Sequence, residues 1–380
     1  MFSEDTFKSV FTEQIKPQHA ANKYHNLFCE GLAANGIAVE ARSSLPLSRA
    51  NCKRIFVHAP AEKRGNFLQK YIFAMNVPVL KHLGLFFNSF FATLFSSKDT
   101  VLIYDALVIS SASGAVLAAK LRRKKAIAIV TDLPQFMPVA QSPTMLRINN
   151  RLLSKADGYV LLTQQMAQVV NPENKPYIVL EGHVDVKMEH AEHAPFSETS
   201  KKVLYAGAIK NEYGIENLCR SFVEIARDNE SLHIFGDGDD ASVPADYAAR
   251  YDNVIYHGSV PNSEVVKAEL ESCLLVNPRP SNQQFTKYSF PSKTLEYMAS
   301  GTPVLMAKLE GAPREYDDYL FYFDDASENG LSQRLREVLD LPTHELEKLG
   351  CINKRFVLEK KNNVVQAKKV LDWIEMSFEK

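Results

Sequence analysis

The chain has 380 residues, of which 46% are hydrophobic and 23% charged, and its formal net charge is -1. This length exceeds one ordinary core, so we expect two domains. Five scattered cysteines exclude a disulfide framework or a zinc site of common spacing, and no stretch approaches the ~20 apolar residues that span a bilayer.

Charge is distributed unevenly along the chain. Residues 1–150 carry 18 Lys/Arg against 9 Asp/Glu, which leaves the first half net positive and the remainder net negative. One interpretation is contact with an anionic ligand or surface, such as a diphosphate or lipid headgroups, and the other is uneven solvated charge without a partner. No signal peptide pattern is present in residues 1–10, so we expect a cytoplasmic protein, at most peripheral to the membrane.

Residues 67–97 are unusually aromatic and contain Pro78, which predicts a broken pair of helices. With the positive first half, this pair could lie on a membrane and receive a lipid-linked acceptor. The alternative is ordinary core packing of two helices. The basic cluster at 121–125 is typical of a helix end, where cations favour the dipole.

Two sets of short apolar runs alternate with helix-length segments. Such runs predict parallel strands covered on both faces, and therefore two doubly wound α/β halves. Asp132 follows the run at 126–130, where ligand-binding residues of such sheets gather, although a helix N-cap explains it equally well. The runs are 101–104, 126–130, 159–162, 177–180, 203–206, 232–235, 253–256, 274–276 and 303–306.

The most polar stretch, residues 181–202, is predicted to link the two halves. Its histidines, His183, His190 and His193, fit no common metal spacing and are assigned to a surface linker. An amphipathic helix without strand partners ends the chain. We therefore expect domains at 1–183 and 200–358, with residues 359–380 packing back toward the first domain.

One short helix, residues 293–300, is delimited on both sides. Pro291 enforces an extended entry, Ser292 is placed to cap the helix, and Gly301 terminates it. Lys293 and Glu296 share one face near the N-terminus, where the helix dipole favours phosphate. They could hold the diphosphate and the ribose of a nucleotide, or form a simple surface ion pair.

The segment FPSKTLEYMASGTPVL at 290–305 resembles the donor-binding motif of family 4 (group 1) retaining glycosyltransferases. Further blocks resemble the same family in the same order, namely 203–218, the two segments around FGDGDD and HGSV, and 311–325. The resemblance implies a GT-B fold, which has two doubly wound Rossmann-like domains with a cleft between them. It also implies that the second domain binds a nucleotide sugar.

The resemblance assigns roles to particular residues. Glu296 matches the glutamate that binds the donor ribose, and Gly207 matches the glycine beside the diphosphate. Ala208 and Tyr213 stand where the family commonly has arginine and lysine, so other cations must meet the phosphates. The expected donor-binding residues are Gly207, Lys210, Arg279, Phe290, Ser292, Lys293 and Glu296.

The expected catalytic set is Asp132, Tyr288 and Lys293. Tyr288 replaces the first glutamate of the family's paired-glutamate pattern, as in some bacterial polysaccharide enzymes. Asp132 stands where enzymes of the family often have a polar residue near the reacting sugar. Residues 17–32 resemble the family's first loop and helix, without the usual glycines.

The resemblance implies transfer of a sugar from a UDP-sugar to a saccharide acceptor with retention of configuration. We expect no metal, no cofactor and no nucleic acid, and an acceptor that is lipid-linked, in synthesis of bacterial capsule, O-antigen or exopolysaccharide. Two alternatives stay open: a sugar-nucleotide epimerase, and a catalytically silent GT-B subunit that stabilises a partner.

Overall fold

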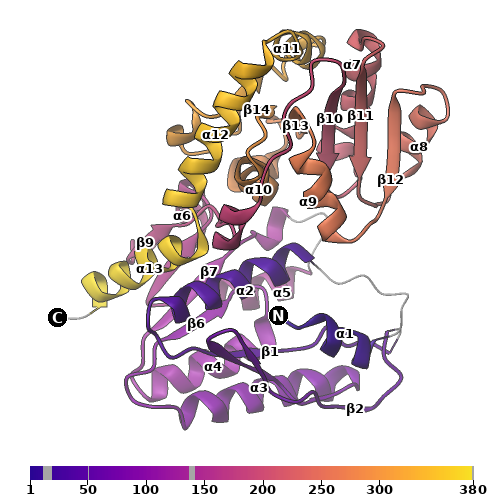
Figure 1. The fold of residues 1–380 in the computed structure, drawn as a ribbon. Coiled ribbons are helices and arrows are strands. Elements are labelled where there is room, and N and C mark those ends of the chain that lie inside the picture. Colours follow the sequence, from indigo (N-terminus) through magenta and orange to yellow (C-terminus); the bar gives the residue numbers. More distant parts are fainter. Residues whose placement is uncertain (12–18, 50, 137–141, 379–380) are drawn as a thin grey trace. The chain divides into compact units, whose positions relative to one another are not determined.

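The computed structural model describes residues 1–11, 19–49, 51–136 and 142–378 (Figure 1). Its internal contacts divide the chain into two compact units. Unit 1 comprises Met1–His183 and Asn363–Lys380, and unit 2 comprises Val184–Asn362. Unit 2 therefore begins within the segment predicted as a linker.

Unit 2 is built on one sheet of six parallel strands. The strands are β10 (Lys201–Ala206), β11 (Glu230–Phe235), β12 (Val254–Gly258), β13 (Leu274–Asn277), β14 (Val304–Ala307) and β15 (Phe321–Phe323). Their order is β12-β11-β10-β13-β14-β15, so the strand order reverses between β10 and β13 while all strands stay parallel. Such a reversal opens a ligand site at the carboxyl ends of the strands.

Helices cover this sheet and bury its apolar strands. They are α7 (Ile215–Ile225), α8 (Ser242–Ala248), α9 (Asn262–Leu270), α10 (Ser292–Ser300), α11 (Gly330–Leu339) and α12 (Thr343–Lys360). Short 3-10 turns are η2 (Val186–His190), η3 (Asn211–Tyr213), η4 (Gln284–Tyr288) and η5 (Arg314–Tyr316). Strand residues such as Leu204, Leu275 and Leu305 are fully buried, as expected for parallel strands covered on both faces.

Unit 1 contains a smaller parallel sheet, in the order β6-β7-β8-β9. Its strands are β6 (Leu102–Asp105), β7 (Ala126–Val130), β8 (Gly158–Leu161) and β9 (Tyr177–Val179). Five more strands precede them in the chain and form separate small sheets. They are β1 (Glu40–Ser43), β2 (Phe56–Val57), β3 (Glu62–Arg64), β4 (Phe67–Tyr71) and β5 (Ala74–Met75).

The helices of unit 1 come from both ends of the chain. They are α1 (Glu4–Val10), α2 (His19–Ala34), α3 (Pro78–Leu94), α4 (Ile109–Leu121), α5 (Pro143–Ser154), α6 (Gln164–Val170), the turn η1 (Pro134–Phe136) and α13 (Asn363–Phe378). Helix α13 packs on α2. A Cβ added at Gly31 of α2 would lie 2.1 Å from the carbonyl oxygen of Asn363, so the two backbones touch.

Two sequence predictions about local structure are corrected here. The aromatic segment 67–97 is not a pair of helices, because its first part forms strands β4 and β5 and only the part from Pro78 is helical. The histidines at 183 and 193 are not on a surface linker. His183 is buried in unit 1 against the ring of Tyr24, and His193 bonds the Ser272 carbonyl oxygen and the Thr302 hydroxyl in unit 2.

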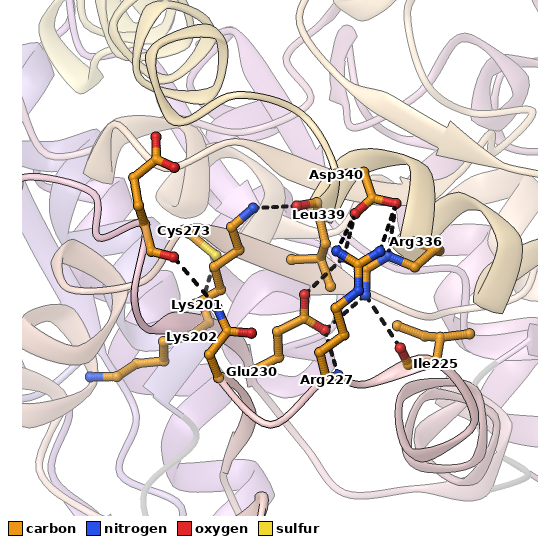
Figure 2. A network of polar contacts seen from close by, with 11 residues as sticks. Lys201, Lys202, Ile225, Arg227, Glu230, Cys273, Arg336, Leu339 and Asp340 are labelled. Atoms are coloured by element: carbon orange, nitrogen blue, oxygen red, sulfur yellow. Dashed lines mark hydrogen bonds and ion pairs between the residues drawn. The ribbon is translucent and has the colours of Figure 1, made fainter.

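A buried ion pair joins helix α11 to the sheet of unit 2 (Figure 2). Arg336 donates two hydrogen bonds to Glu230, at 2.9 and 2.8 Å, and also binds Asp340. The side chain of Glu230 is 2% exposed and that of Arg336 is 20% exposed. Burial alone would raise the pKa of Glu230, but the bonds from Arg336 hold it below its usual value.

Candidate functional site

The candidate site lies at the carboxyl ends of β10 and β13, where the strand order reverses. Gly207 follows the last residue of β10, and its N–H donates to the carbonyl oxygen of Phe235 at 3.0 Å. Two residues on, the N–H of Ile209 donates to Asp237 at 3.0 Å. The loop after β10 therefore runs directly beside the glycine-rich loop after β11.

Close approach of these two loops requires glycine. Gly236 has φ +136°, and a Cβ there would lie 1.8 Å from the carbonyl oxygen of Gly207. A Cβ at Gly238 would lie 2.1 Å from the carbonyl oxygen of Ile209. Both distances are far inside van der Waals contact, so the FGDGDD segment holds the Gly207 loop in place through backbone contact.

The substitution Gly236→Ala is expected to displace the Gly207 loop and to weaken nucleotide binding by about tenfold or more, since a few tenths of an ångström matter at a preorganised site. The measurement is calorimetric titration with UDP. The control is Gly258→Ala, because Gly258 has φ +65° but open space around its Cβ position. It tests strain of the left-handed backbone without a clash. Equal affinities for wild type and Gly236→Ala would contradict the prediction.

Two cations contact the ring of Tyr213, which ends the loop. The guanidinium carbon of Arg279 lies 4.3 Å from the ring centroid, and the Nζ of Lys210 lies 5.9 Å from it. Arg279 also lies 5.6 Å from the ring of Phe285, and Lys210 is 3.7 Å from the Glu212 carboxylate. The structure thus brings Lys210 and Arg279 together at the tyrosine that occupies the expected lysine position.

A cavity of about 340 Å³ opens beside this loop. Asn211 and Gly214 line it from the loop, Glu216 lines it from the start of α7, and Pro278 and Pro280 line it from the segment after β13. The point where the strand order reverses therefore has a cavity as well as charged side chains.

Helix α10 is tied to the end of β10 by one side chain. The Tyr297 hydroxyl accepts from the Ala206 N–H at 2.7 Å and donates to the Ala206 carbonyl oxygen at 3.0 Å. Tyr297 is buried, and burial raises the pKa of its hydroxyl well above the usual value. This contact fixes α10 against the carboxyl end of β10, the strand that Gly207 follows.

Lys293 occupies the first turn of α10 and contacts two carboxylates. Its Nζ lies 3.1 Å from the Oε2 of Glu296 and 3.8 Å from the Oε1 of Glu269 on α9. Burial alone would lower the pKa of Lys293, but the two carboxylates raise it above its ordinary value. The i,i+3 ion pair between Lys293 and Glu296 is therefore present, and buried Glu269 extends it into a three-membered cluster.

Three other predicted residues of this segment differ from one another in their surroundings. Ser292 does not cap α10: it is the first helical residue, and Pro291 precedes it without a side-chain cap. Phe290 is 3% exposed and packs on Tyr316 at 5.0 Å between ring centroids, so its side chain belongs to the core. Tyr288 ends η4 and is half-buried. Gly301 ends the helix with φ +86°, as predicted.

Unit 1 carries polar groups at the carboxyl ends of its own strands. Asp132 follows β7 by two residues and is exposed. Asp105, at the end of β6, accepts from His25 of α2, with 3.0 Å between Nε2 and Oδ2. Burial alone would raise the pKa of Asp105, but His25 lowers it below the usual value.

Sequence reasoning missed Glu269, Tyr297 and the His25–Asp105 pair. Each depends on a partner from a distant segment. Only Asp105 left a signal, because it stands at the end of the apolar run at 101–104 as Asp132 stands after the next run.

In residues 1–11, 19–49, 51–136 and 142–378, no helix is both long and apolar enough to cross a membrane.

Residues 200–340 match the family model of glycosyl transferases group 1. This range contains the loop after β10, the whole of α10 and the segment that follows it. No curated protein matches the chain by sequence.

Solved structures of similar fold cover most of the chain. The apo structure of OtsA has a TM-score of 0.67 at 9% identity, covering 94% of this chain and 97% of that one. Anabaena Alr3699/HepE in complex with UDP has a TM-score of 0.60 at 13% identity, covering 81% and 86%. The lipopolysaccharide outer core galactosyltransferase WaaB has a TM-score of 0.57 at 16% identity, covering 82% and 84%. At these identities the likeness shows the fold.

Proposed function

The chain carries a group 1 glycosyl transferase domain within a GT-B fold, and from this premise we propose that it is a retaining glycosyltransferase using a UDP-sugar. The acceptor in this proposal is a saccharide. Unit 2 binds the donor, and unit 1 binds the acceptor.

One observation carries the proposal: the Tyr297 hydroxyl bonds to Ala206, which brings α10 to the carboxyl end of β10. Around that point are a glycine loop that permits close approach of phosphate, the cations Lys210 and Arg279, and the Lys293–Glu296 pair. A helix N-terminus with a cation beside a glycine turn suits a diphosphate, and a carboxylate suits a ribose diol. Anabaena Alr3699/HepE, similar in fold, has been solved in complex with UDP.

In the proposed reaction the bond between the anomeric carbon and the diphosphate oxygen breaks, and the acceptor hydroxyl oxygen forms a bond on the same face. The acceptor proton passes to the departing diphosphate, so no protein base is required. Negative charge grows on that diphosphate, and Lys210, Arg279, Lys293 and the start of α10 are proposed to stabilise it. Asp132 and Tyr288 are proposed to contact the reacting sugar.

The acceptor is proposed to be lipid-linked, in synthesis of a bacterial surface polysaccharide at the inner face of the membrane. WaaB, which is similar in fold, is a lipopolysaccharide outer core galactosyltransferase. The positive charge of residues 1–150 is also suited to an anionic membrane surface.

A thermal-shift screen of nucleotide sugars tests the donor assignment. A ligand that binds only the folded protein raises the unfolding midpoint, and we expect UDP and at least one UDP-sugar to raise it by several degrees at 100 times their Kd. Release of UDP and a transferred sugar then identifies a transferase. Isomerised donor without any acceptor would indicate an epimerase, and binding without turnover would indicate a silent subunit. The absence of any shift with nucleotides would contradict the proposal.

A further inference from the structure

Helix α3 of unit 1 turns its apolar side chains outward. Val79, Leu80, Leu83, Phe87 and Phe91 are each between 46% and 71% exposed. The fully buried positions of the same helix are Leu85 and Ser89. A helix on a soluble core shows the opposite arrangement, with its large apolar stripe inward. The exposed stripe of α3 therefore has no partner within the described chain.

Helix α3 is held to unit 1 by close backbone packing against α4, so the exposed rings are not required to attach it. A Cβ added at Gly114 of α4 would lie 2.1 Å from the carbonyl oxygen of Phe86, so the two helix backbones touch. His82, near the start of α3, contacts Ser110 near the start of α4 at 2.7 Å. Beyond the ends of the same helices, Lys124 donates to the Ser96 carbonyl oxygen at 2.9 Å, and both contacts join residues 28 apart in sequence. The helices are therefore parallel, with the small residues of α4 as the packing surface.

The exposed rings form an ordered row. Phe87 and Phe91 are stacked with ring centroids 6.4 Å apart, and Phe91 and Phe95 are stacked at 6.3 Å. Phe95, just beyond the helix, is 81% exposed. Stacking along one side fixes the rings in place and leaves a continuous aromatic surface.

The apolar surface continues onto α4. Leu117 and Leu121 are 47% and 63% exposed, and they lie three and seven residues after Gly114. At that spacing they are on the side of α4 that meets α3. We call the exposed residues of both helices the α3–α4 face: Val79, Leu80, Leu83, Phe87, Phe91, Leu117 and Leu121.

Positive charge lies at one end of the α3–α4 face. Arg122 and Arg123 follow α4 and are exposed, as is Lys98 after α3. Lys124 ties the two helix ends together through the carbonyl oxygens of Thr93 and Ser96. No Asp or Glu occurs in α3, whose sequence is PVLKHLGLFFNSFFATL.

We propose that the α3–α4 face binds an anionic lipid bilayer, with its rings and leucines at the boundary between headgroups and acyl chains. An apolar helix face with a basic end matches both layers of such a surface. A second copy of the chain would present the same positive charge, which anionic headgroups attract and a like surface repels. This binding is separate from the donor site and does not require transferase activity.

The experiment is sedimentation of the full chain with phosphatidylglycerol–phosphatidylcholine vesicles, without any nucleotide, beside vesicles of phosphatidylcholine alone. We expect binding to the anionic vesicles that weakens with salt. Phe87→Ser with Phe91→Ser should lower the affinity by about 10-fold or more, because each ring removes apolar area from the bilayer. Arg122→Gln with Arg123→Gln should lower it by about 30-fold on anionic vesicles, since two charges are lost at ~1 kcal/mol each.

The control is Met376→Ser, since Met376 is 75% exposed but lies on α13, which packs on α2. It should leave vesicle binding unchanged, and all variants should keep the wild-type unfolding midpoint or exceed it. Wild-type protein that stays in the supernatant overturns the proposal. So does a double phenylalanine variant that binds as wild type, or a wild-type dimer in light scattering that the same variant converts to monomer.

Discussion

Replacing Lys293 with alanine is expected to lower kcat/KM for the UDP-sugar by about 100-fold, in the range measured when one preorganised donor to a developing anion is removed. The ammonium group lies 3.1 Å from Glu296 and 3.8 Å from Glu269. In the proposed donor site, its loss removes a cation from the start of α10 and leaves two carboxylates there unneutralised, which disfavours the charge that grows on the leaving diphosphate. Turnover should fall much more than acceptor affinity does. Initial rates measured while the donor and acceptor concentrations are varied give both quantities.

A matched control is Lys267→Ala, on helix α9 two residues before Glu269. Its side chain is 78% exposed and pairs with Glu271 at 3.9 Å, so its removal should change kcat/KM by less than about twofold. Unchanged turnover in Lys293→Ala would refute the role assigned to Lys293 in the donor site.

Breaking the buried pair between Glu230 and Arg336 should have the largest effect on stability. Arg336→Met removes both hydrogen bonds to a carboxylate that is 2% exposed and leaves that charge buried. The expected loss is about 3 kcal/mol. Urea unfolding followed by circular dichroism measures it, and the fluorescence of Trp373, which is in unit 1, separates the transitions of the two units.

The lowered pKa of Glu230 predicts how the stability contributed by this pair changes with pH. Because the folded pKa of Glu230 is lowered, its contribution is complete above the unfolded value of about 4.3 and is lost as pH falls through the folded value. The difference between wild type and Arg336→Met should therefore be full at pH 7 and shrink in acid. As a control, Lys368→Ala breaks an exposed pair with Asp372 and should change stability by less than about 1 kcal/mol. An equal loss in both variants would contradict the assignment.

The parallel strands could be predicted because each is a continuous apolar run. The runs at 126–130 and 203–206 lie within β7 and β10, and both sheets are parallel as expected. The strands before residue 101 could not be predicted in the same way. In strand β4, FLQKY, buried and more exposed side chains alternate over only five residues, and the aromatic helix that follows masks so short a pattern.

The candidate site was predicted where local sequence determines it. Gly301 ends α10 in the left-handed region, and Lys293 and Glu296 share a face because helical spacing requires it. Glu269 and Tyr297 could not be assigned, since their roles depend on which helix lies beside α10 and which strand lies beneath it. Ser292 was misplaced by one residue, which is the usual uncertainty of a helix boundary.

The return of α13 to unit 1 makes unit 2 an inserted domain. The chain enters unit 2 at Val184 and leaves it at Asn362, and these two residues are joined by a parallel bridge, with the Val184 N–H bonded to the Lys361 carbonyl oxygen at 3.0 Å. Entry and exit are thus adjacent, as in loops that accept whole foreign domains. Unit 2 is therefore one continuous segment of the chain inserted between two segments of unit 1. Unit 1, in contrast, completes its core only after the last helix has been synthesised, because α13 supplies Ala367, Val370 and Trp373 to it.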